Sequence, residues 1–204
     1  MSHYFESNPI SISKERKIKA IISGQPFVFV TDNDVFSKKG LDFGTRTLLE
    51  SLNLNMIDGR ILDFGCGYGP IGIYLAYYGK KVDMIDINNR ALSLSKKNSK
   101  LNKVEVNIFE SNMYENITHK YDYIISNPPI RVGKKVLYEI LFGAKEHLKP
   151  EGHLIFVIHK DQGAKTLIDV LKAEYSVSIL NKNKGFFVID CQNHWQVAHS
   201  LVKL

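Results

Sequence analysis

The sequence predicts an α/β fold in which helices cover both faces of a mostly parallel β-sheet. Glycines crowd the turn between a short apolar run and an amphipathic segment. Strand-like and helix-like runs then alternate from residue 60 to residue 173, and two strand-like runs close the pattern as a hairpin. Repeated βα units imply parallel strands, and ligands of such sheets bind beyond the carboxyl ends of the strands.

The first 59 residues are expected to form an extension ahead of this sheet. Two β-like runs flank Gly24, Gln25 and Pro26, and this arrangement predicts a hairpin. A helix follows, because three leucines between residues 48 and 52 recur at helical spacing. The expected strands are residues 18–22 and 27–31, the loop is 32–40, the helix is 45–52 and the linker is 53–59.

From residue 60 onward, short apolar runs bounded by turn residues predict buried strands, and longer runs with three- and four-residue spacing predict helices. The expected strands are residues 61–64, 82–85, 104–109, 121–126 and 153–158, and the expected helices are 71–78, 90–101, 135–148 and 163–173. The closing hairpin joins residues 176–180 and 185–189 across 181–184. Beyond it, Trp195 and several aliphatic residues predict a short packed helix in the tail.

Size and composition favour one folded domain. A chain of 204 residues with 44% hydrophobic residues can bury a core. Cys66 and Cys191 have neither a disulfide pattern nor zinc-ligand spacing, and the histidines also lack metal-ligand spacing, so we expect no metal. The N-terminus resembles no signal or transit peptide and no apolar run reaches membrane-spanning length, so we expect a cytoplasmic protein with no membrane partner.

The net charge of +6 permits a polyanionic partner. Basic residues gather near the N-terminus and beside a proline motif described below. They are Lys14, Arg16, Lys17, Lys19, Lys38, Lys39, Arg46, Arg131, Lys134 and Lys135. From charge alone, binding of nucleic acid and a simple solvated surface are equally good interpretations.

The glycine-rich turn predicts a site for an adenosine-containing cofactor. Gly65, Gly67 and Gly69 allow close approach of the backbone to a ligand, and Pro70 suits the first turn of the helix behind them. The N-terminus of that helix favours a carboxylate or phosphate. Asp63, just before the glycines, either braces this loop or contacts an amino group of the cofactor, and both readings stay open.

Polar residues follow the next two strands. Asp86 lies about twenty residues beyond the glycines, where a carboxylate can accept hydrogen bonds from both ribose hydroxyls. Asn112 ends the third strand and either contacts the adenine edge or forms a turn. Residues 67–72 also satisfy the dinucleotide pattern G-x-G-x-x-G, so an NAD-dependent oxidoreductase is an alternative.

A second motif, Asn127-Pro128-Pro129-Ile130-Arg131, ends the fourth strand, because prolines cannot continue a central strand. Pro129 keeps Pro128 extended and fixes the direction of its carbonyl. The side-chain oxygen of Asn127 and that carbonyl can then face one exocyclic amine. Two acceptors on the amine hydrogens favour a pyramidal nitrogen and direct its lone pair at an electrophile, such as a sulfonium methyl group. The motif therefore predicts catalysis by Asn127 and Pro128, and an Asn-Pro turn is the structural alternative.

Both motifs resemble those of a known enzyme class. Asp63-x-Gly-x-Gly-x-Gly69 resembles motif I of class I S-adenosylmethionine-dependent methyltransferases, and the position of Asp86 and the strand–helix order also fit that class. Asn127-Pro-Pro resembles the (N/D)-P-P-(aromatic) motif of enzymes that methylate adenine N6, guanine N2 or a glutamine amide. Ile130 departs from the aromatic residue, which stacks on a flipped base, and Phe36 is a candidate substitute for it.

A more extensive resemblance covers nearly the whole chain. The residues that carry it are His3-Tyr-Phe, Val35-Phe-Ser37, Leu41-Asp-Phe-Gly-Thr45, Asp63 to Gly69, Ser111-Asn112 and Asn127-Pro-Pro-Ile-Arg-x-Gly133. Together they resemble the small methyltransferases related to the catalytic half of the 16S rRNA guanine-N2 methyltransferase RsmC. The resemblance implies a Rossmann-like sheet, S-adenosylmethionine as cofactor, and a segment 36–45, including Thr45, that closes over cofactor and target.

The same resemblance implies RNA as partner, either small-subunit ribosomal RNA or a ribosomal subunit, with guanine N2 as the methylated atom. On the substrate side we expect Phe36, Pro129, Ile130, Arg131 and Lys134, the two cations contacting phosphate or solvent. One methyltransferase domain would span residues 1–204, divided into an extension (1–59), a cofactor-binding core (60–190) and a tail (191–204). Adenine N6, a protein glutamine amide and a small-molecule amine remain alternative targets.

Overall fold

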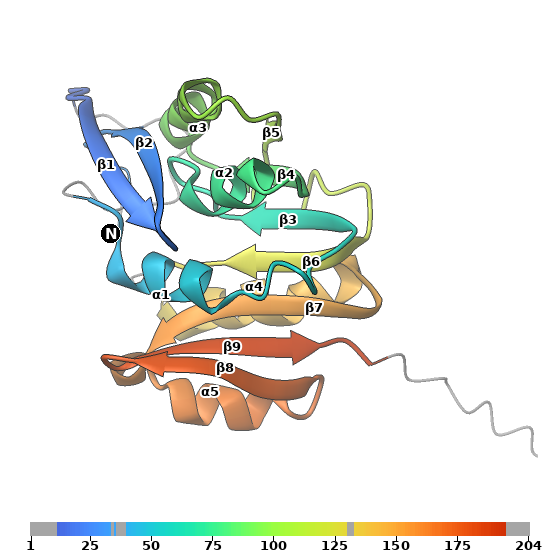
Figure 1. Ribbon diagram of the computed structural model, residues 1–204. Helices are drawn as coiled ribbons and strands as arrows, with labels where there is room; N and C mark the ends of the chain where they lie inside the picture. Colours follow the sequence, from blue (N-terminus) through green and yellow to red (C-terminus); the bar gives the residue numbers. More distant parts are fainter. Residues whose placement is uncertain (1–11, 34, 36–39, 130–132, 195–204) are drawn as a thin grey trace, which may run out of the picture.

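The structure is a computed structural model that describes residues 12–33, 35, 40–129 and 133–194. Seven strands of this part of the chain form one sheet (Figure 1). They are β3 (Arg60–Phe64), β4 (Lys81–Asp86), β5 (Asn107–Glu110), β6 (Tyr121–Ser126), β7 (Leu148–His159), β8 (Ser176–Asn183) and β9 (Phe186–Gln192). Their order is β5-β4-β3-β6-β7-β9-β8. The first five run parallel, and β9 is antiparallel to both neighbours, so the predicted fold class is confirmed.

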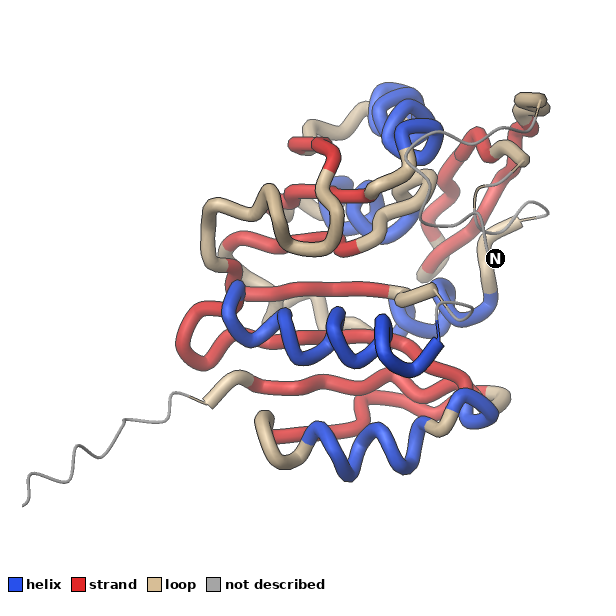
Figure 2. The backbone as a smooth tube through the Cα atoms, turned by 180° about the vertical axis from the view of Figure 1, so that it is seen from behind, coloured by secondary structure: helices blue, strands red, loops and turns tan. Residues whose placement is uncertain are grey.

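Helices cover both faces of the sheet (Figures 1 and 2). The helices are α1 (Phe43–Ser51), α2 (Pro70–Tyr77), α3 (Asn89–Leu101), α4 (Gly133–His147), the 3₁₀ turn η3 (Lys160–Gln162) and α5 (Ala164–Leu171). On one face lie α1, α2, α3 and a separate hairpin of β1 (Arg16–Ile22) and β2 (Gln25–Thr31), whereas α4 and α5 cover the other. No helix of the described segments is long and apolar enough to cross a membrane.

Alternation along the strands builds two cores. Ile61 and Met84 lie in the cluster on the α1–α3 face, whereas the next residue of each strand, Leu62 or Ile85, lies in the cluster under α4 and α5. Successive side chains of a strand point to opposite faces. Because both faces are covered, both members of each pair are apolar, as expected of a parallel sheet.

The two hairpin turns differ from their predictions. β2 begins at Gln25, and Pro26 pairs with Ile21, so the predicted turn Gly24-Gln25-Pro26 is wrong. The turn is Ser23-Gly24, with φ of 48° and 80°. The closing hairpin likewise turns at residues 184–185, with φ of 45° and 85°, instead of across 181–184. Tight hairpins prefer two central residues with positive φ, because this twist matches that of the strands.

Three further strand boundaries differ from the predicted ones, because strand pairing sets where each strand begins or ends. β5 begins at Asn107, opposite Asp83, three residues later than predicted. Leu148, expected at the end of a helix, instead pairs with Tyr121 and begins β7. β9 continues to Gln192, which pairs with His153, so the sheet extends into the segment assigned to the tail. The helix expected around Trp195 lies outside the described residues.

Two asparagines of α3 attach the hairpin to the core. Asn98 accepts from the Val30 N–H (2.6 Å) and donates to the Val30 carbonyl (2.9 Å). Asn102 makes the same pair of bonds with Val28, at 3.1 and 2.7 Å. Asn98 and Asn102 are four residues apart and therefore lie on one face of α3. Val28 and Val30 are two residues apart and direct their backbone groups to the same edge of β2, so the two pairs can meet. Asn98 also donates to the carbonyl of Tyr68 (2.8 Å), which links the hairpin to the glycine loop.

Candidate cofactor and catalytic site

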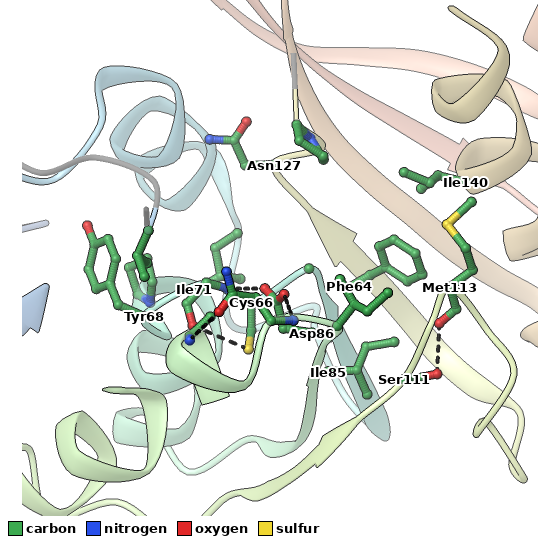
Figure 3. Close-up of a pocket in the computed structure, with 18 of the residues that line it drawn as sticks. Phe64, Cys66, Tyr68, Ile71, Ile85, Asp86, Ser111, Met113, Asn127 and Ile140 are labelled. Atoms are coloured by element: carbon green, nitrogen blue, oxygen red, sulfur yellow. Dashed lines mark hydrogen bonds between the residues drawn. The ribbon is translucent and has the colours of Figure 1, made fainter. Parts of the chain in front are cut away.

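A cavity opens at the carboxyl ends of β3, β4 and β6 (Figure 3). The space among its lining residues, with the open solvent at its mouth included, is about 990 Å³. Its lining residues are Val35, Thr45, Phe64, Gly65, Cys66, Gly67, Tyr68, Pro70, Ile71, Ile85, Asp86, Ile87, Asn88, Ala91, Ser111, Asn112, Met113, Asn127, Pro129 and Ile140. Both predicted motifs therefore contribute to one cavity.

The glycine loop requires glycine at two positions for different reasons. Gly67 has φ of 57°, and in this left-handed conformation its N–H donates to Asp86 Oδ2 at 2.8 Å. Gly69 has φ of 95° and caps α2. A Cβ at Gly69 would lie 2.9 Å from Met84 Cε and 3.0 Å from Ser95 Oγ. The loop thus packs closely on the elements behind it and turns its other side to the cavity.

Asp86 lies in the cavity wall at the end of β4. Its Oδ1 accepts from the Asn88 N–H at 2.9 Å, and its Oδ2 accepts from Gly67. Burial raises the pKa of Asp86, and the hydrogen bonds from Asn88 and Gly67 oppose that rise. Each carboxylate oxygen can accept more than one hydrogen bond. A fixed carboxylate of this kind can therefore accept from two neighbouring hydroxyls of a ligand.

Asp63 lies behind the loop and is not among the residues that line the cavity. It is 0% exposed, and its Oδ2 accepts from the Gly72 N–H at 2.8 Å. Its Oδ1 has no hydrogen-bond partner among the described residues. Burial, together with the charge of Asp86, raises the pKa of Asp63 to about 7. Of the two predicted roles, the structure places Asp63 as the brace, since it satisfies a free N–H in the first turn of α2.

Asn127 is held by two residues of the N-terminal extension. Its Nδ2 donates to Asp42 Oδ2 (3.0 Å) and to Thr45 Oγ1 (2.9 Å). A carboxylate can only accept, so the NH2 of the amide must face Asp42 and the Oδ1 must face elsewhere. Asp42 is itself fixed as the N-cap of α1, where it accepts from the Thr45 N–H at 2.9 Å. Thr45, predicted at the cofactor, lines the cavity and also orients Asn127.

The other predicted site residues that the structure describes line two neighbouring cavities. Asn112 lines the first cavity and also forms a turn, with its Nδ2 donating to Glu115 Oε1 at 2.8 Å. Pro129 lines both cavities, whereas Pro128 and the exposed Lys134 line only the adjoining one, between α4, the end of β7 and η3. Phe36, Ile130 and Arg131 lie outside the described residues.

Asp42 and Met113 belong to the site but were not assigned a role from the sequence. Asp42 had a detectable signal, because an aspartate just before a helix is a favoured N-cap residue. Met113 has φ of 52° and lines the cavity after β5, and no sequence pattern marks it. Across the described part of the chain, no group of three His, Cys, Asp or Glu side chains could hold a metal ion.

Comparisons with known proteins show the family of the chain. The model of the methyltransferase small domain family matches residues 4–190. The uncharacterised Bacillus subtilis (strain 168) protein YbxB is 40% identical over 193 residues, which cover 92% of this chain and 96% of YbxB. Ribosomal RNA small subunit methyltransferase C of Psychromonas ingrahamii is 36% identical over 163 residues, which cover 77% of this chain and 46% of that protein.

A solved structure has the same fold. The T. thermophilus 16S rRNA N2 G1207 methyltransferase RsmC, in complex with AdoMet and guanosine, superposes with a TM-score of 0.80 at 23% identity. The match covers 91% of this chain and 52% of RsmC, so the chain spans about half the length of the RsmC proteins that it matches. The family accounts for the glycine pattern without NAD. The chain belongs to the methyltransferase small domain family and is a class I S-adenosylmethionine-dependent methyltransferase related to RsmC.

Proposed function

We propose that this methyltransferase acts on the exocyclic N2 of a guanine in small-subunit ribosomal RNA. The observation that carries the proposal is the amide of Asn127, which Asp42 and Thr45 orient in the wall of the cavity that also contains Asp86. The names of the related RsmC proteins support an RNA guanine as target. A substrate in ribosomal RNA would place the reaction in the compartment of the ribosomes, the cytoplasm.

The residues of the cavity fit the cofactor. Asp86 would accept hydrogen bonds from the ribose hydroxyls, and the backbone of Gly65, Gly67 and Gly69 would allow the methionine part to approach closely. The apolar side chains Ile87 and Met113, with Asn112 beside them, would surround the adenine. When bound, S-adenosylmethionine supplies an electrophilic methyl group whose transfer leaves an electron pair on sulfur.

The chain's own contribution to the reaction would be position. With its NH2 group held by Asp42 and Thr45, Asn127 would present Oδ1 as an acceptor. Pro128 lines the adjoining cavity, next to Pro129, which lines both, and the carbonyl of Pro128 would provide the second acceptor where the two cavities meet. Two acceptors on the hydrogens of an exocyclic amine reduce delocalisation of its lone pair and fix its direction. Positioning of two reactants can lower a barrier by several kcal/mol, about 7–11 in favourable cases.

Other amines share this chemistry. Adenine N6, a protein glutamine amide and a small-molecule amine would each satisfy two acceptors. No observation within the described residues favours one of them over guanine N2, whereas the relatives that match most of this chain's length and have a named activity are rRNA methyltransferases. The chain is therefore proposed to share their substrate class.

Replacing Asn127 tests the proposal. Asn127→Ala should reduce transfer of tritiated methyl groups to unmodified small-subunit rRNA by about a hundredfold or more, because the oriented acceptor is lost. Its affinity for S-adenosylmethionine, measured by calorimetry, should stay close to that of the wild-type protein. Asp86→Ala is the matched variant, and its main effect should be weaker binding of S-adenosylmethionine.

Nucleoside analysis of the labelled RNA identifies the methylated atom. N2-methylguanosine supports the proposal, whereas label in N6-methyladenosine or only in protein would assign another substrate. Unchanged turnover of Asn127→Ala would remove the role given to its amide. The RNA should come from transcription in vitro, so that no site is already methylated.

A further inference from the structure

We propose that the β1–β2 hairpin and α3 together bind the phosphate backbone of the RNA substrate. We call this surface the hairpin–α3 face and define it by six exposed basic side chains, Arg16, Lys17, Lys19, Lys96, Lys100 and Lys103. The inference rests on the proposed function and adds where the RNA outside the target nucleotide would lie. The surface is separate from the residues that line the cofactor cavity.

The positive charge of the protein is concentrated here. Residues 12–33 and 89–103 contain nine basic and two acidic residues, a surplus of seven, whereas the whole chain has a net charge of +6. The rest of the chain is therefore slightly acidic. Basic residues elsewhere are balanced by acidic ones, as is typical of a solvated surface, whereas an unbalanced positive surface suits a polyanion.

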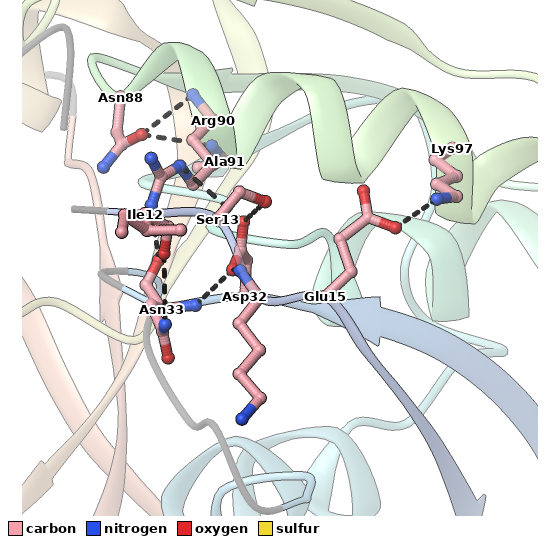
Figure 4. Close-up of polar contacts among 10 residues, drawn as sticks. Ile12, Ser13, Glu15, Asp32, Asn33, Asn88, Arg90, Ala91 and Lys97 are labelled. Atoms are coloured by element: carbon pink, nitrogen blue, oxygen red, sulfur yellow. Dashed lines mark hydrogen bonds and ion pairs between the residues drawn. The ribbon is translucent and has the colours of Figure 1, made fainter. Parts of the chain in front are cut away.

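One of the two acidic residues is withdrawn from the surface. Asp32 is 3% exposed and accepts hydrogen bonds from Ser13 Oγ (2.6 Å) and the Lys14 N–H (2.5 Å), and Arg90 Nε lies 3.7 Å from it. Figure 4 shows Asp32, just after β2, between the segment before β1 and the beginning of α3. Glu15 remains on the surface, where it pairs with Lys97. Lys96 and Lys100 pair with no described carboxylate and can meet phosphates.

The two segments form one continuous surface. Asn98 and Asn102 attach the edge of β2 to α3, and Glu15 crosses from the hairpin side to Lys97. On β1 the inward side chains alternate with Lys17 and Lys19, which point away from the core. The cations of both elements are thus held on a rigid support, which reduces the entropy lost when they bind a ligand.

The hairpin–α3 face begins at the edge of the cofactor cavity. Asn88, the N-cap of α3, and Ala91 line the cavity, and so does Val35, shortly after β2 ends. With a rise of 1.5 Å per residue, Lys96 and Lys100 lie roughly 10–20 Å along α3 from Asn88. Bound along this face, an RNA strand can deliver one of its nucleotides to the cavity while neighbouring phosphates contact the lysines.

Neutralising part of the face tests the inference in the full-length protein. In filter binding to small-subunit rRNA transcribed in vitro, the triple variant Lys17→Gln, Lys19→Gln, Lys100→Gln should bind about tenfold or more weakly near physiological salt. The slope of log Kd against log salt concentration should fall by about two to three, because each lost phosphate contact removes nearly one unit. The matched control neutralises Lys81, Lys120 and Lys172, exposed lysines outside the face, and should change Kd less than about twofold.

Further measurements separate the possible outcomes. At saturating RNA the triple variant should keep its turnover number and its calorimetric affinity for S-adenosylmethionine, with only the KM for RNA raised. Equal loss of RNA affinity in both triple variants would overturn the inference. Displacement of the RNA by polyglutamate at the same charge concentration would also overturn it, because the surface would then bind any polyanion. If RNA binding follows the prediction but guanine N2 is not methylated, the proposed target fails and the docking surface stands.

Discussion

At the scale of single residues, two carboxylates near the glycine loop lie in different surroundings. Asp86 faces the cavity with both oxygens bonded to backbone N–H groups. Asp63 is 0% exposed and bonds Gly72 through one oxygen only. Both have a raised pKa, with burial as the largest cause. Asp63 therefore stabilises the loop from inside, and its protonation state affects stability more than it affects contact with a ligand.

Asp63→Asn should flatten the dependence of stability on pH. The folded-state pKa of Asp63 is about 7, against an ordinary value of 3.8, so the folded protein binds this proton more tightly than the unfolded chain. Protonation of Asp63 therefore stabilises the folded state, fully below about pH 4, and this stabilisation is lost as the pH rises through 7. Between pH 5 and pH 8 the free energy of unfolding should fall by an amount on the order of 2–3 kcal/mol for this reason. In thermal melts, the wild-type Tm should fall across this range by several degrees more than that of the variant. Parallel profiles would contradict the assignment.

At the scale of elements, the extension packs against the core through side-chain amides. The spacing of Asn98 and Asn102 on α3 matches the edge of β2, so each amide replaces the backbone partner that a further strand would provide. On the other side of the cavity, Asp42 caps α1 and fixes Asn127. The extension therefore contributes to the site through α1, whose N-cap holds Asn127, and it exposes basic side chains on β1.

Asn98→Ala should destabilise the protein by about 2–3 kcal/mol in urea unfolding, because it leaves the buried N–H and C=O of Val30 without their partners. Asn102→Ala should cost less, about 1–2 kcal/mol, since this asparagine is only half-buried. The exposed Asn55→Ala is the control and should stay within about 0.5 kcal/mol of wild type. An Asn98 variant as stable as the control would show that the hairpin is held by its apolar face alone.

At the scale of the whole molecule, the cavity is assembled from the ends of several strands and from the extension. Its walls come from the loops after β3, β4, β5 and β6, together with Val35 and Thr45. A ligand that contacts all of these segments should stabilise the folded state as a unit, because binding to the native state alone shifts the folding equilibrium.

S-adenosylhomocysteine at about one hundred times its Kd should stabilise the protein by about 2.7 kcal/mol and raise Tm by roughly 5–10 °C. Hydrogen exchange should slow at residues 65–69, 86–88 and 111–113, which line or adjoin the cavity. NAD at the same concentration serves as the control and should leave Tm and exchange unchanged. Stabilisation by NAD instead would contradict the cofactor assignment.

Much of the fold could be predicted because its signals are local. Alternation such as Ile61-Leu62 reflects the two-residue period of a strand, and the positive φ of Gly67 and Gly69 reflects a steric rule that acts within one residue. The position of Asp86 after its strand is likewise a property of the βα unit. Hairpin turns were misplaced, because several turn residues adjoin each other and strand pairing alone selects among them.

By itself, the sequence determined the sheet, the glycine loop and the residues of the Asn-Pro motif, since each depends on short-range geometry. Only the tertiary structure decided how they act together. Asn127 meets Asp42 and Thr45 across 85 and 82 residues, and no periodicity encodes a contact of that range. It also decided that Asp63 braces the loop, because burial depends on the packing of the whole sheet, and that β2 of the hairpin lies against α3.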